Sequence, residues 1–260
     1  EYQTRMEKRM SNREEVVITK AECLADGVYS MVLKTEVIAG KAKPGQFVSL
    51  YSGDGSRLLP RPISICEIDG TYIRLVYRVA GKGTQGFSKL KAGDTITVQG
   101  PLGNGYDVKA PYAGKKAIIF GGGIGIPPML ELAKQLHCEK DILLGYRDSQ
   151  TFLADEFAKY GNVTIASEDG SVGVKGNVLD AVKQCSITGQ VIYACGPTPM
   201  LRAIKSFALD NDIECFISLE EKMACGIGAC LACVCQTKDI DDHSKVHNAR
   251  VCKEGPVFNA

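Results

Sequence analysis

Five of the eleven cysteines lie between positions 225 and 252, close enough to form a metal centre. Cys225, Cys230 and Cys233 have a C-x4-C-x2-C spacing, and Cys252 follows further along the chain. Three thiolates from one loop and a fourth from a distant segment is the ligand pattern of plant-type [2Fe–2S] clusters. The intervening residues are mostly glycine and alanine, which let a backbone wrap closely around a cluster and aim N–H groups at its sulfurs. The spacing therefore predicts a [2Fe–2S] site.

Two alternatives to this site follow from the same cysteines. Structural zinc sites usually pair two short C-x2–4-C hooks, and a second hook is missing here, but zinc or plain burial of the thiols stays open. Cys235 competes with Cys252 for the fourth ligand position because it lies two residues after Cys233. Cys252 approaches from another segment, so we expect Cys252 to be the ligand.

A glycine-rich loop, GGGIGIPP at 121–128, joins a short apolar stretch to a helical one. Glycines at such a turn permit positive φ and let a pyrophosphate approach the N–H groups at a helix start, where proline is also tolerated. The pattern departs from G-x-G-x-x-G, and an ordinary strand-to-helix turn is the alternative. It lacks G-K-[ST], which disfavours ATP hydrolysis. The loop predicts nucleotide binding by Gly121, Gly122, Gly123 and Gly125.

Two further segments follow predicted strands on the same side. Cys195, Gly196 and Pro197 end an apolar stretch, and Cys195 taken alone fits a small buried hydrophobe better than a reactive thiol. Arg147 and Asp148 follow another stretch. An acidic residue there often binds the ribose 2′-hydroxyl of NAD, whereas arginine suits NADP. Together they favour NAD, and a solvated turn is the alternative.

The elements that must position these residues follow two patterns. Short alternating stretches separated by turn residues recur from Val16 to about Gly105 and predict a small antiparallel barrel or sandwich. Strands and helices then alternate, which predicts a doubly wound parallel sheet with its ligands at one edge. The expected barrel strands are 16–20, 29–34, 46–51, 72–78 and 95–100. The expected sheet strands are 117–120, 142–146, 162–167, 190–195 and 213–219, with helices at 129–136, 152–160, 177–185 and 199–210.

The predicted fold class is therefore α/β plus all-β, divided into four segments. Residues 1–14 form an N-terminal tail, and residues 15–112 form an antiparallel β-barrel. Residues 113–220 form a five-stranded parallel α/β domain. Residues 221–260 form a small cysteine-rich domain that fits neither pattern.

Composition and charge exclude several classes of protein. The chain has 31 basic and 30 acidic residues and a net charge of +1, so no electrostatic argument supports nucleic acid or an anionic membrane as partner. No apolar stretch reaches the ~20 residues of a membrane span, and the charged first residues lack the hydrophobic core of a signal peptide. We expect a cytoplasmic protein whose cysteines are reduced.

Several motifs together resemble a known superfamily. RPIS at 61–64, YR at 77–78, GKGT at 81–84 and GDTITVQGPLGNGYD at 93–107 look like the flavin barrel of ferredoxin reductases. GGGIGIPP and CGPTPM resemble the nicotinamide-nucleotide domain of that superfamily. The C-terminal EEKMACGIGACLACVC and VCKEGPVF narrow the resemblance to the electron-transfer subunits of dihydroorotate dehydrogenase B. The likeness covers about residues 15–260.

The resemblance implies FAD in the barrel and NAD as substrate of the α/β domain. It implies that Arg61 binds the flavin pyrophosphate and that Ser64 lies near the isoalloxazine. Without the family, Arg61 is better explained as a surface charge and Ser64 as a plain strand residue. Cys195, Gly196 and Pro197 would lie at the nicotinamide, and Glu220 would approach the flavin–nicotinamide junction or remain a solvated charge. The other implied flavin contacts are Pro62, Ile63, Val76, Tyr77, Arg78, Gly83 and Thr84.

The function implied by the resemblance is an electron relay in pyrimidine biosynthesis, with catalytic positions at Cys195, Ser64 and Glu220. Electrons would pass from a partner flavin through [2Fe–2S] and FAD to NAD⁺, because flavin exchanges either one or two electrons. Dihydroorotate oxidation would belong to an FMN-containing catalytic subunit in a heterotetramer. A ferredoxin–NAD(P) reductase or a bifurcating-oxidoreductase small subunit is the nearest alternative. A zinc-stabilised binding module without a redox role is the more distant one.

Overall fold

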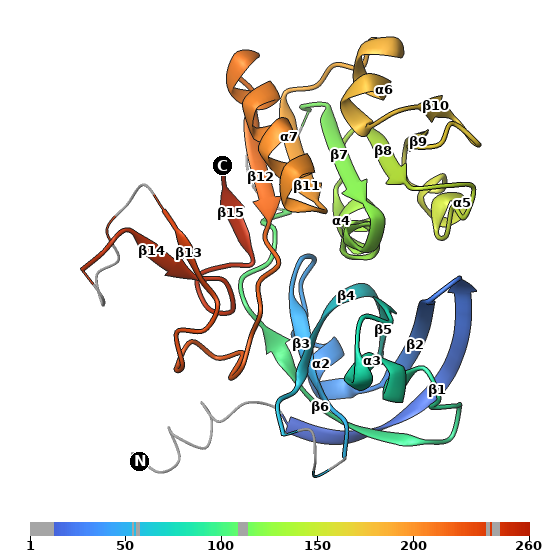
Figure 1. Cartoon of the computed structure of the whole chain (residues 1–260), viewed down its shortest axis with the longest axis vertical. Coiled ribbons are helices and arrows are strands. Elements are labelled where there is room, and N and C mark those ends of the chain that lie inside the picture. Colours follow the sequence, from blue (N-terminus) through green and yellow to red (C-terminus); the bar gives the residue numbers. More distant parts are fainter. Residues whose placement is uncertain (1–12, 54, 56–57, 109–113, 238–239, 241–244) are drawn as a thin grey trace.

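The computed structural model describes residues 13–53, 55, 58–108, 114–237, 240 and 245–260. An α/β domain and a β-barrel lie against each other, and the C-terminal segment packs beside both (Figure 1). The predicted fold class is confirmed. The predicted boundary at 112/113 and most of the 1–14 tail lie outside the described residues.

Six of the described strands form a closed barrel in the order β1-β2-β5-β4-β3-β6. Alternating side chains such as Ile18, Leu33 and Leu75 fill its interior. The five predicted strands are all present. The elements of this part are β1 (Arg13–Ala25), β2 (Val28–Lys34), α2 (Glu36–Ala39), β3 (Phe47–Tyr51), β4 (Arg61–Asp69), β5 (Tyr72–Arg78), α3 (Lys82–Phe87) and β6 (Thr95–Leu102).

Strand β4 is not among the five predicted barrel strands, although Ser64 taken without the family was interpreted as a strand residue. Proline is uncommon inside a paired strand, and Pro62 lies within β4. The structure explains how the proline is accommodated. β4 pairs with β3 through Arg61–Ser64 and with β5 only from Ile65 onward. Pro62 therefore lies where β4 has a pairing neighbour on one side only.

The α/β domain contains a sheet of seven described strands in the order β10-β9-β8-β7-β11-β12-β15. The five predicted strands form its parallel centre, and β10 and β15 extend its edges. Its strands are β7 (Ala117–Gly122), β8 (Lys140–Tyr146), β9 (Asn162–Ser167), β10 (Val174–Lys175), β11 (Val191–Cys195), β12 (Glu214–Ser218) and β15 (Val257–Asn259). Its helices are η1 (Gly123–Gly125), α4 (Pro127–Gln135), α5 (Ala154–Phe157), α6 (Val178–Gln184) and α7 (Thr198–Asp210).

Helix α4 lies between the sheet and the barrel (Figure 1). Its buried residues share one apolar core with Val28, Cys66 and Val76 of the barrel. The opposite face of the sheet forms a separate core with α6 and α7. The barrel is therefore fixed against the helix that follows the glycine-rich loop.

The C-terminal segment is attached to both domains. β13 (Val234–Gln236) and β14 (Asn248–Arg250) pair with each other, whereas β15 joins the α/β sheet antiparallel to β12. On the barrel side, the Asn104 side-chain amide donates to the carbonyl oxygens of Lys253 and Glu254 at 3.0 and 3.1 Å. The predicted segment 221–260 thus contributes a strand to the neighbouring domain.

None of the helices in the described part of the chain is both long and apolar enough to span a bilayer.

Candidate functional site

The glycine-rich loop and the Cys195–Pro197 turn lie side by side. They follow β7 and β11, which are parallel neighbours with Gly121 opposite Cys195. The strand order reverses direction between these two strands, since β8 lies on one side of β7 and β11 on the other. Open α/β sheets bind ligands at the carboxyl ends of the strands at such a reversal.

The two loops touch through their backbones. A Cβ on Gly125 would lie 2.5 Å from the backbone carbon and oxygen of Cys195 and from the nitrogen of Gly196. A Cβ on Gly122 would lie 2.5 Å from the Met200 sulfur. Of the loop glycines predicted to bind nucleotide, Gly123 alone takes a positive φ, at 52°. The close approach of the loop to the Cys195–Pro197 turn and to Met200, more than a left-handed backbone conformation, therefore explains why glycines are found here.

Cys195 lies at the end of β11 with its thiol near Ser218 and Glu220. Burial raises the pKa of the Cys195 thiol to about 12, and the negative charge of Glu220 adds to this effect, although a hydrogen bond with Ser218 opposes it. The thiol is therefore protonated at neutral pH. It can pack against a nicotinamide or exchange a hydrogen bond with it, but it is a poor nucleophile. The Glu220 side chain is exposed.

On the barrel, Arg61 and Gly83 come together. A Cβ on Gly83 would lie 2.5 Å from Nε of Arg61, so the arginine lies directly over the glycine. Arg61 Nη1 also donates to the Leu59 carbonyl oxygen at 2.7 Å. The Thr84 hydroxyl accepts from Ala80 N at 2.9 Å and donates to the Gly81 carbonyl oxygen at 3.1 Å, so it shapes the loop that begins α3.

The predicted flavin residues of β4 and β5 face different surroundings. Val76 contributes to the core shared with the α/β domain, whereas Tyr77 points into the barrel. The centroid of the Tyr77 ring lies 6.2 Å from the ring centroid of Tyr29 and 6.2 Å from that of Phe87. Arg78 is exposed, and its Nη2 lies 3.9 Å from where a Cβ on Gly123 would be. Arg78 therefore connects the barrel to the glycine-rich loop. Pro62, Ile63 and Ser64 are half-buried along β4, opposite Ser49, Val48 and Phe47.

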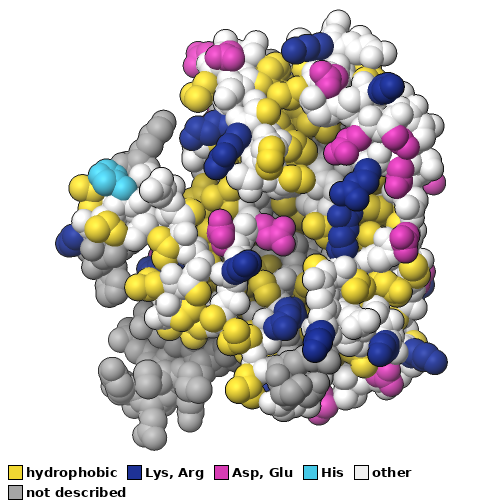
Figure 2. All heavy atoms as spheres, in the orientation of Figure 1, with side chains coloured by type: hydrophobic (Ala, Val, Ile, Leu, Met, Phe, Trp, Pro, Cys, Tyr) yellow, Lys and Arg dark blue, Asp and Glu magenta, His cyan; other side chains and the backbone are white. Residues whose placement is uncertain are grey.

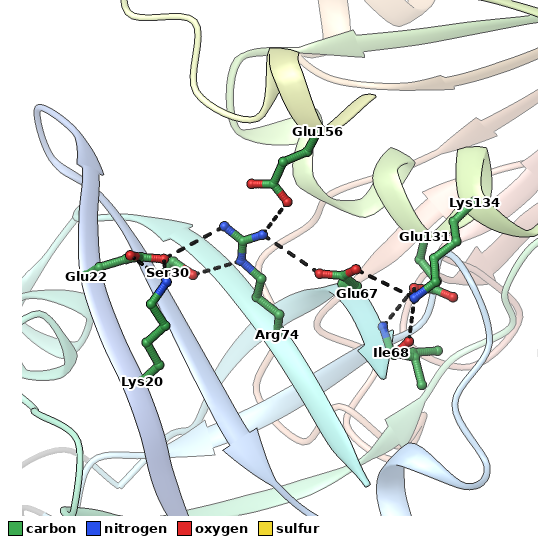
Figure 3. Close-up of polar contacts among 9 residues, drawn as sticks. All are labelled: Lys20, Glu22, Ser30, Glu67, Ile68, Arg74, Glu131, Lys134 and Glu156. Atoms are coloured by element: carbon green, nitrogen blue, oxygen red, sulfur yellow. Dashed lines mark hydrogen bonds and ion pairs between the residues drawn. The ribbon is translucent and has the colours of Figure 1, made fainter. Parts of the chain in front are cut away.

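A group of charged residues joins the barrel to the α/β domain (Figure 3). Arg74 of β5 donates from Nη1 to Glu156 of α5 at 2.6 Å and from Nε to Ser30 at 3.0 Å. Buried Glu131 of α4 accepts from Ile68 N at 2.7 Å, and Lys134 Nζ donates to the Ile68 carbonyl oxygen at 2.8 Å. These residues, which we call the domain clamp, hold the helix behind the glycine-rich loop against β4.

Sequence reasoning missed the domain clamp. Its residues are ordinary charged side chains spread over β5, α4 and α5, and no motif marks them. The α4 periodicity offered one signal, because Glu131 interrupts the otherwise apolar buried side of that helix.

The four predicted cluster cysteines come together as two pairs. The thiol of Cys225 interacts with that of Cys230, and the thiol of Cys233 with that of Cys252. Backbone N–H groups also point at the sulfurs. Gly228 N lies 3.1 Å from Cys252 Sγ, and Ala229 N lies 3.3 Å from Cys225 Sγ.

The surroundings treat the thiols of Cys225 and Cys252 differently. Burial alone would raise the pKa of Cys225, but the Ile227 N–H, the Cys230 thiol and further backbone donors lower it to about 7. Burial and the neighbouring Cys233 raise the pKa of Cys252 to about 12. The loop thus favours a thiolate at Cys225 before any metal contributes its charge.

These cysteines supply the ligand type of an iron–sulfur cluster. Within the described ranges, no group of three or more His, Cys, Asp or Glu side chains is placed to hold a metal ion. Two pairs of thiols, each able to hold one iron, match the donor set of a [2Fe–2S] cluster. Cys235 lies in β13 opposite Ala249 and packs against the apolar group that contains Cys233 and Cys252.

Comparisons with known proteins agree with this geometry. Residues 220–260 match the family model described as the iron–sulfur cluster binding domain of dihydroorotate dehydrogenase B. The chain is 46% identical to the dihydroorotate dehydrogenase B (NAD(+)) electron transfer subunit of Listeria monocytogenes, over 96% of this chain and 98% of the relative. It is 40% identical to the subunit of the same name from a Geobacillus species, with the same two coverages.

A solved structure has the same overall fold. It is an NADH-dependent reduced ferredoxin-NADP oxidoreductase, described in connection with flavin-based electron bifurcation, with a TM-score of 0.83 and 27% identity. The match covers 94% of this chain and 87% of that chain. On the extent of these matches, the chain belongs to the family of dihydroorotate dehydrogenase B electron transfer subunits, oxidoreductase components with a ferredoxin-reductase fold and an iron–sulfur domain.

Proposed function

We propose that this chain carries electrons from a dihydroorotate-oxidising subunit to NAD⁺. In this proposal the cysteine loop holds a [2Fe–2S] cluster, the barrel holds FAD, and the crevice at β7 and β11 holds NAD. Such a flavin exchanges hydride with NAD and single electrons with the cluster. The chain's own residues bind, orient and shield these groups.

The observation that carries the proposal is that the barrel contacts both of the other sites. On one side, Phe47 of β3 packs in the same apolar group as Cys233 and Cys252. On the other side, Arg78 of β5 lies beside Gly123 of the nucleotide loop. Ser64 of β4 pairs directly with Phe47 of β3. A flavin against β4 would therefore lie beside β3 and β5, the two strands that contact the cysteine loop and the glycine-rich loop.

We assign each site residue a role that follows from its surroundings. The Arg61 guanidinium, packed over Gly83, supplies positive charge for a pyrophosphate, and Arg78 supplies a second cation at the glycine-rich loop. Thr84 fixes the loop between β5 and α3. Cys195, Ser64 and Glu220 would lie at the junction of flavin and nicotinamide, with Cys195 as a protonated thiol. Cys225 and Cys230 would hold one iron, and Cys233 and Cys252 the other.

The partner in this proposal is an FMN-containing catalytic subunit, assembled with this chain as a heterotetramer. Ile227 and Leu231 flank the cluster cysteines and are 52% and 53% exposed. Hydrophobic side chains are visible on the surface of this segment (Figure 2). Apolar side chains around a redox centre suit a partner that must approach the cluster closely. A cytoplasmic location stays a prediction.

Spectroscopy and co-purification test the proposal together. We expect anaerobically purified protein to contain FAD and two irons per chain, to oxidise NADH, and to co-purify with an FMN protein that oxidises dihydroorotate with NAD⁺. Substituting Ile227→Asp and Leu231→Asp should release the partner, whereas Leu209→Asp, at an exposed site on α7, should not. A colourless zinc protein would contradict the proposal.

A second candidate is a reductase or bifurcating subunit with another partner. The match to the ferredoxin-NADP oxidoreductase over almost the whole chain favours it. Recovery of a different flavoprotein dehydrogenase in the same co-purification, without dihydroorotate oxidation, would support this candidate instead.

A further inference from the structure

Arg250 lies directly behind the loop that carries the first three cluster cysteines. It ends β14, two residues before Cys252, and its side chain is only 12% exposed. Its Nη1 donates to the carbonyl oxygen of Gly228 at 3.0 Å. A largely buried cation therefore makes a direct contact with the backbone of the cysteine loop.

Glu254 fixes the orientation of this arginine. One carboxylate oxygen accepts from Arg250 N at 2.8 Å and from Nε at 3.0 Å. The other carboxylate oxygen pairs with Nη2. Both oxygens are thus engaged, and the guanidinium has its remaining edge turned toward Gly228.

The Gly228 carbonyl belongs to the same peptide group as the Ala229 N–H. That N–H donates to Cys225 Sγ at 3.3 Å, and Gly228's own N–H donates to Cys252 Sγ at 3.1 Å. A donor on the carbonyl side of a peptide polarises the group and strengthens its N–H as a donor. Arg250 therefore polarises the Ala229 N–H on Cys225 Sγ. The Gly228 N–H belongs to the preceding peptide group, so Arg250 affects its contact with Cys252 Sγ only by fixing the position of Gly228.

We propose that Arg250 and Glu254 are positioning residues that set the reduction potential of the cluster by holding the Gly228 and Ala229 N–H groups on its sulfurs. The inference rests on the proposed [2Fe–2S] site. Reduction adds negative charge, so N–H donors to the sulfurs stabilise the reduced form and raise the potential. Loss of the Arg250–Glu254 pair should lower it.

Glu254→Gln gives the sharpest test because a pure charge effect and a positioning effect predict shifts of opposite sign in the reduction potential. Removal of a nearby negative charge alone should raise the potential. Loss of the support for Arg250, since a Gln amide presents N–H groups to the guanidinium, should lower it. We expect the reduction potential of the Glu254→Gln variant to fall by ~28 mV, which is about a threefold change in the one-electron redox equilibrium.

A double-mutant cycle tests whether Glu254 acts through Arg250. Arg250→Met should lower the reduction potential by ~59 mV, which is about a tenfold change in the one-electron redox equilibrium. In the Arg250→Met background there is no guanidinium to hold, so Glu254→Gln should raise the potential instead of lowering it. An equal shift in both backgrounds would overturn the inference.

Two charge controls complete the design. Arg250→Lys keeps the positive charge and loses the planar fork, so it should also lower the potential, and a wild-type value would overturn the inference. Lys253→Met removes an exposed cation whose chain packs on Gly228 but which is not bonded to the Gly228 carbonyl, and it should shift the potential less than Arg250→Lys.

The measurement is an EPR-monitored redox titration of the FAD- and cluster-loaded protein, with iron content determined for each variant. Absence of a [2Fe–2S] signal in the wild-type protein would contradict the proposed function itself. A normal wild-type signal together with an unchanged or raised potential in Glu254→Gln would overturn only the role of the Arg250–Glu254 pair.

Discussion

The nucleotide crevice and the cysteine loop are built by opposite means. At the crevice, two strand ends of one sheet bring backbone against backbone, and glycines are required because a Cβ on Gly125 would overlap Cys195 and Gly196. At the cysteine loop, regular structure is sparse, and Arg250 with Glu254 holds the loop through side-chain contacts.

This difference shows how each site tolerates change. A site held by backbone packing should fail when a methyl group is added, since strands of a sheet cannot yield. A site held by side chains should still form after a small substitution, but one of its properties, such as its reduction potential, should change. Four substitutions can break or sharpen this comparison.

Loss of a cluster ligand should have the largest effect. Cys252→Ser should remove the [2Fe–2S] EPR signal because the Cys233 side is left with one thiol, whereas Cys235→Ser should keep it. Iron content and EPR of the reduced protein measure this. Loss of the signal in Cys235→Ser with retention in Cys252→Ser would reverse the ligand assignment.

Gly125→Ala should come next. The added methyl meets backbone atoms at 2.5 Å, so the crevice must open, and misplacement of about 1 Å can cost ~100-fold in rate. We expect kcat/KM for NADH, measured with ferricyanide as acceptor, to fall by about that factor while the cluster signal stays normal. Gly55→Ala, with no atom within 4 Å of its Cβ, is the matched control. Equal activities would refute the packing argument.

Arg74→Met should have an intermediate effect by opening the domain clamp. It removes the hydrogen bonds to Glu156 and Ser30 and leaves Glu156 without this partner. We expect a loss of about 2 kcal/mol in the free energy of unfolding, measured by urea denaturation, together with slower flavin reduction by NADH. Lys116→Met, which breaks ion pairs within the α/β domain alone, should leave flavin reduction unchanged.

Glu131→Gln should have the smallest effect and appear as a pH dependence. Burial is the main cause that raises the pKa of Glu131 above the ordinary 4.5. The native state then holds a proton that the unfolded chain has lost, so this carboxyl costs stability as the pH rises from 4.5. Gln keeps an acceptor for Ile68 N, and the variant should gain stability relative to wild type over that range. Urea denaturation at each pH measures this, and a difference in the free energy of unfolding between variant and wild type that does not change with pH would contradict the prediction.

Sequence reasoning predicted what local spacing encodes. The C-x4-C-x2-C pattern predicted the cysteine loop, and the alternation of strands and helices predicted the sheet that brings Gly121 and Cys195 together. Contacts between distant segments left no such trace. Arg250 and Glu254 are ordinary charged residues in the sequence, and β15 joins a sheet from a segment that showed no strand pattern.

Two further features of the structure could not be predicted from the local sequence. Tyr77 and Val76 are adjacent in a strand, so they must face opposite sides, and the family motif alone did not reveal which one points into the barrel. The helix expected at 152–160 is reduced to Ala154–Phe157, and its later start follows from Leu153, which takes a left-handed φ of 69° immediately before it. Tertiary context decided both positions.

The central claim is that electrons pass between the nucleotide crevice and the cysteine loop through the barrel. Rapid-freeze EPR after anaerobic mixing with NADH tests it most directly. We predict that the reduced [2Fe–2S] signal forms in the FAD-loaded protein and is absent when FAD has been removed. Flavin that is fully reduced by NADH beside a cluster that stays oxidised, or a cluster reduced equally well without FAD, would contradict the claim.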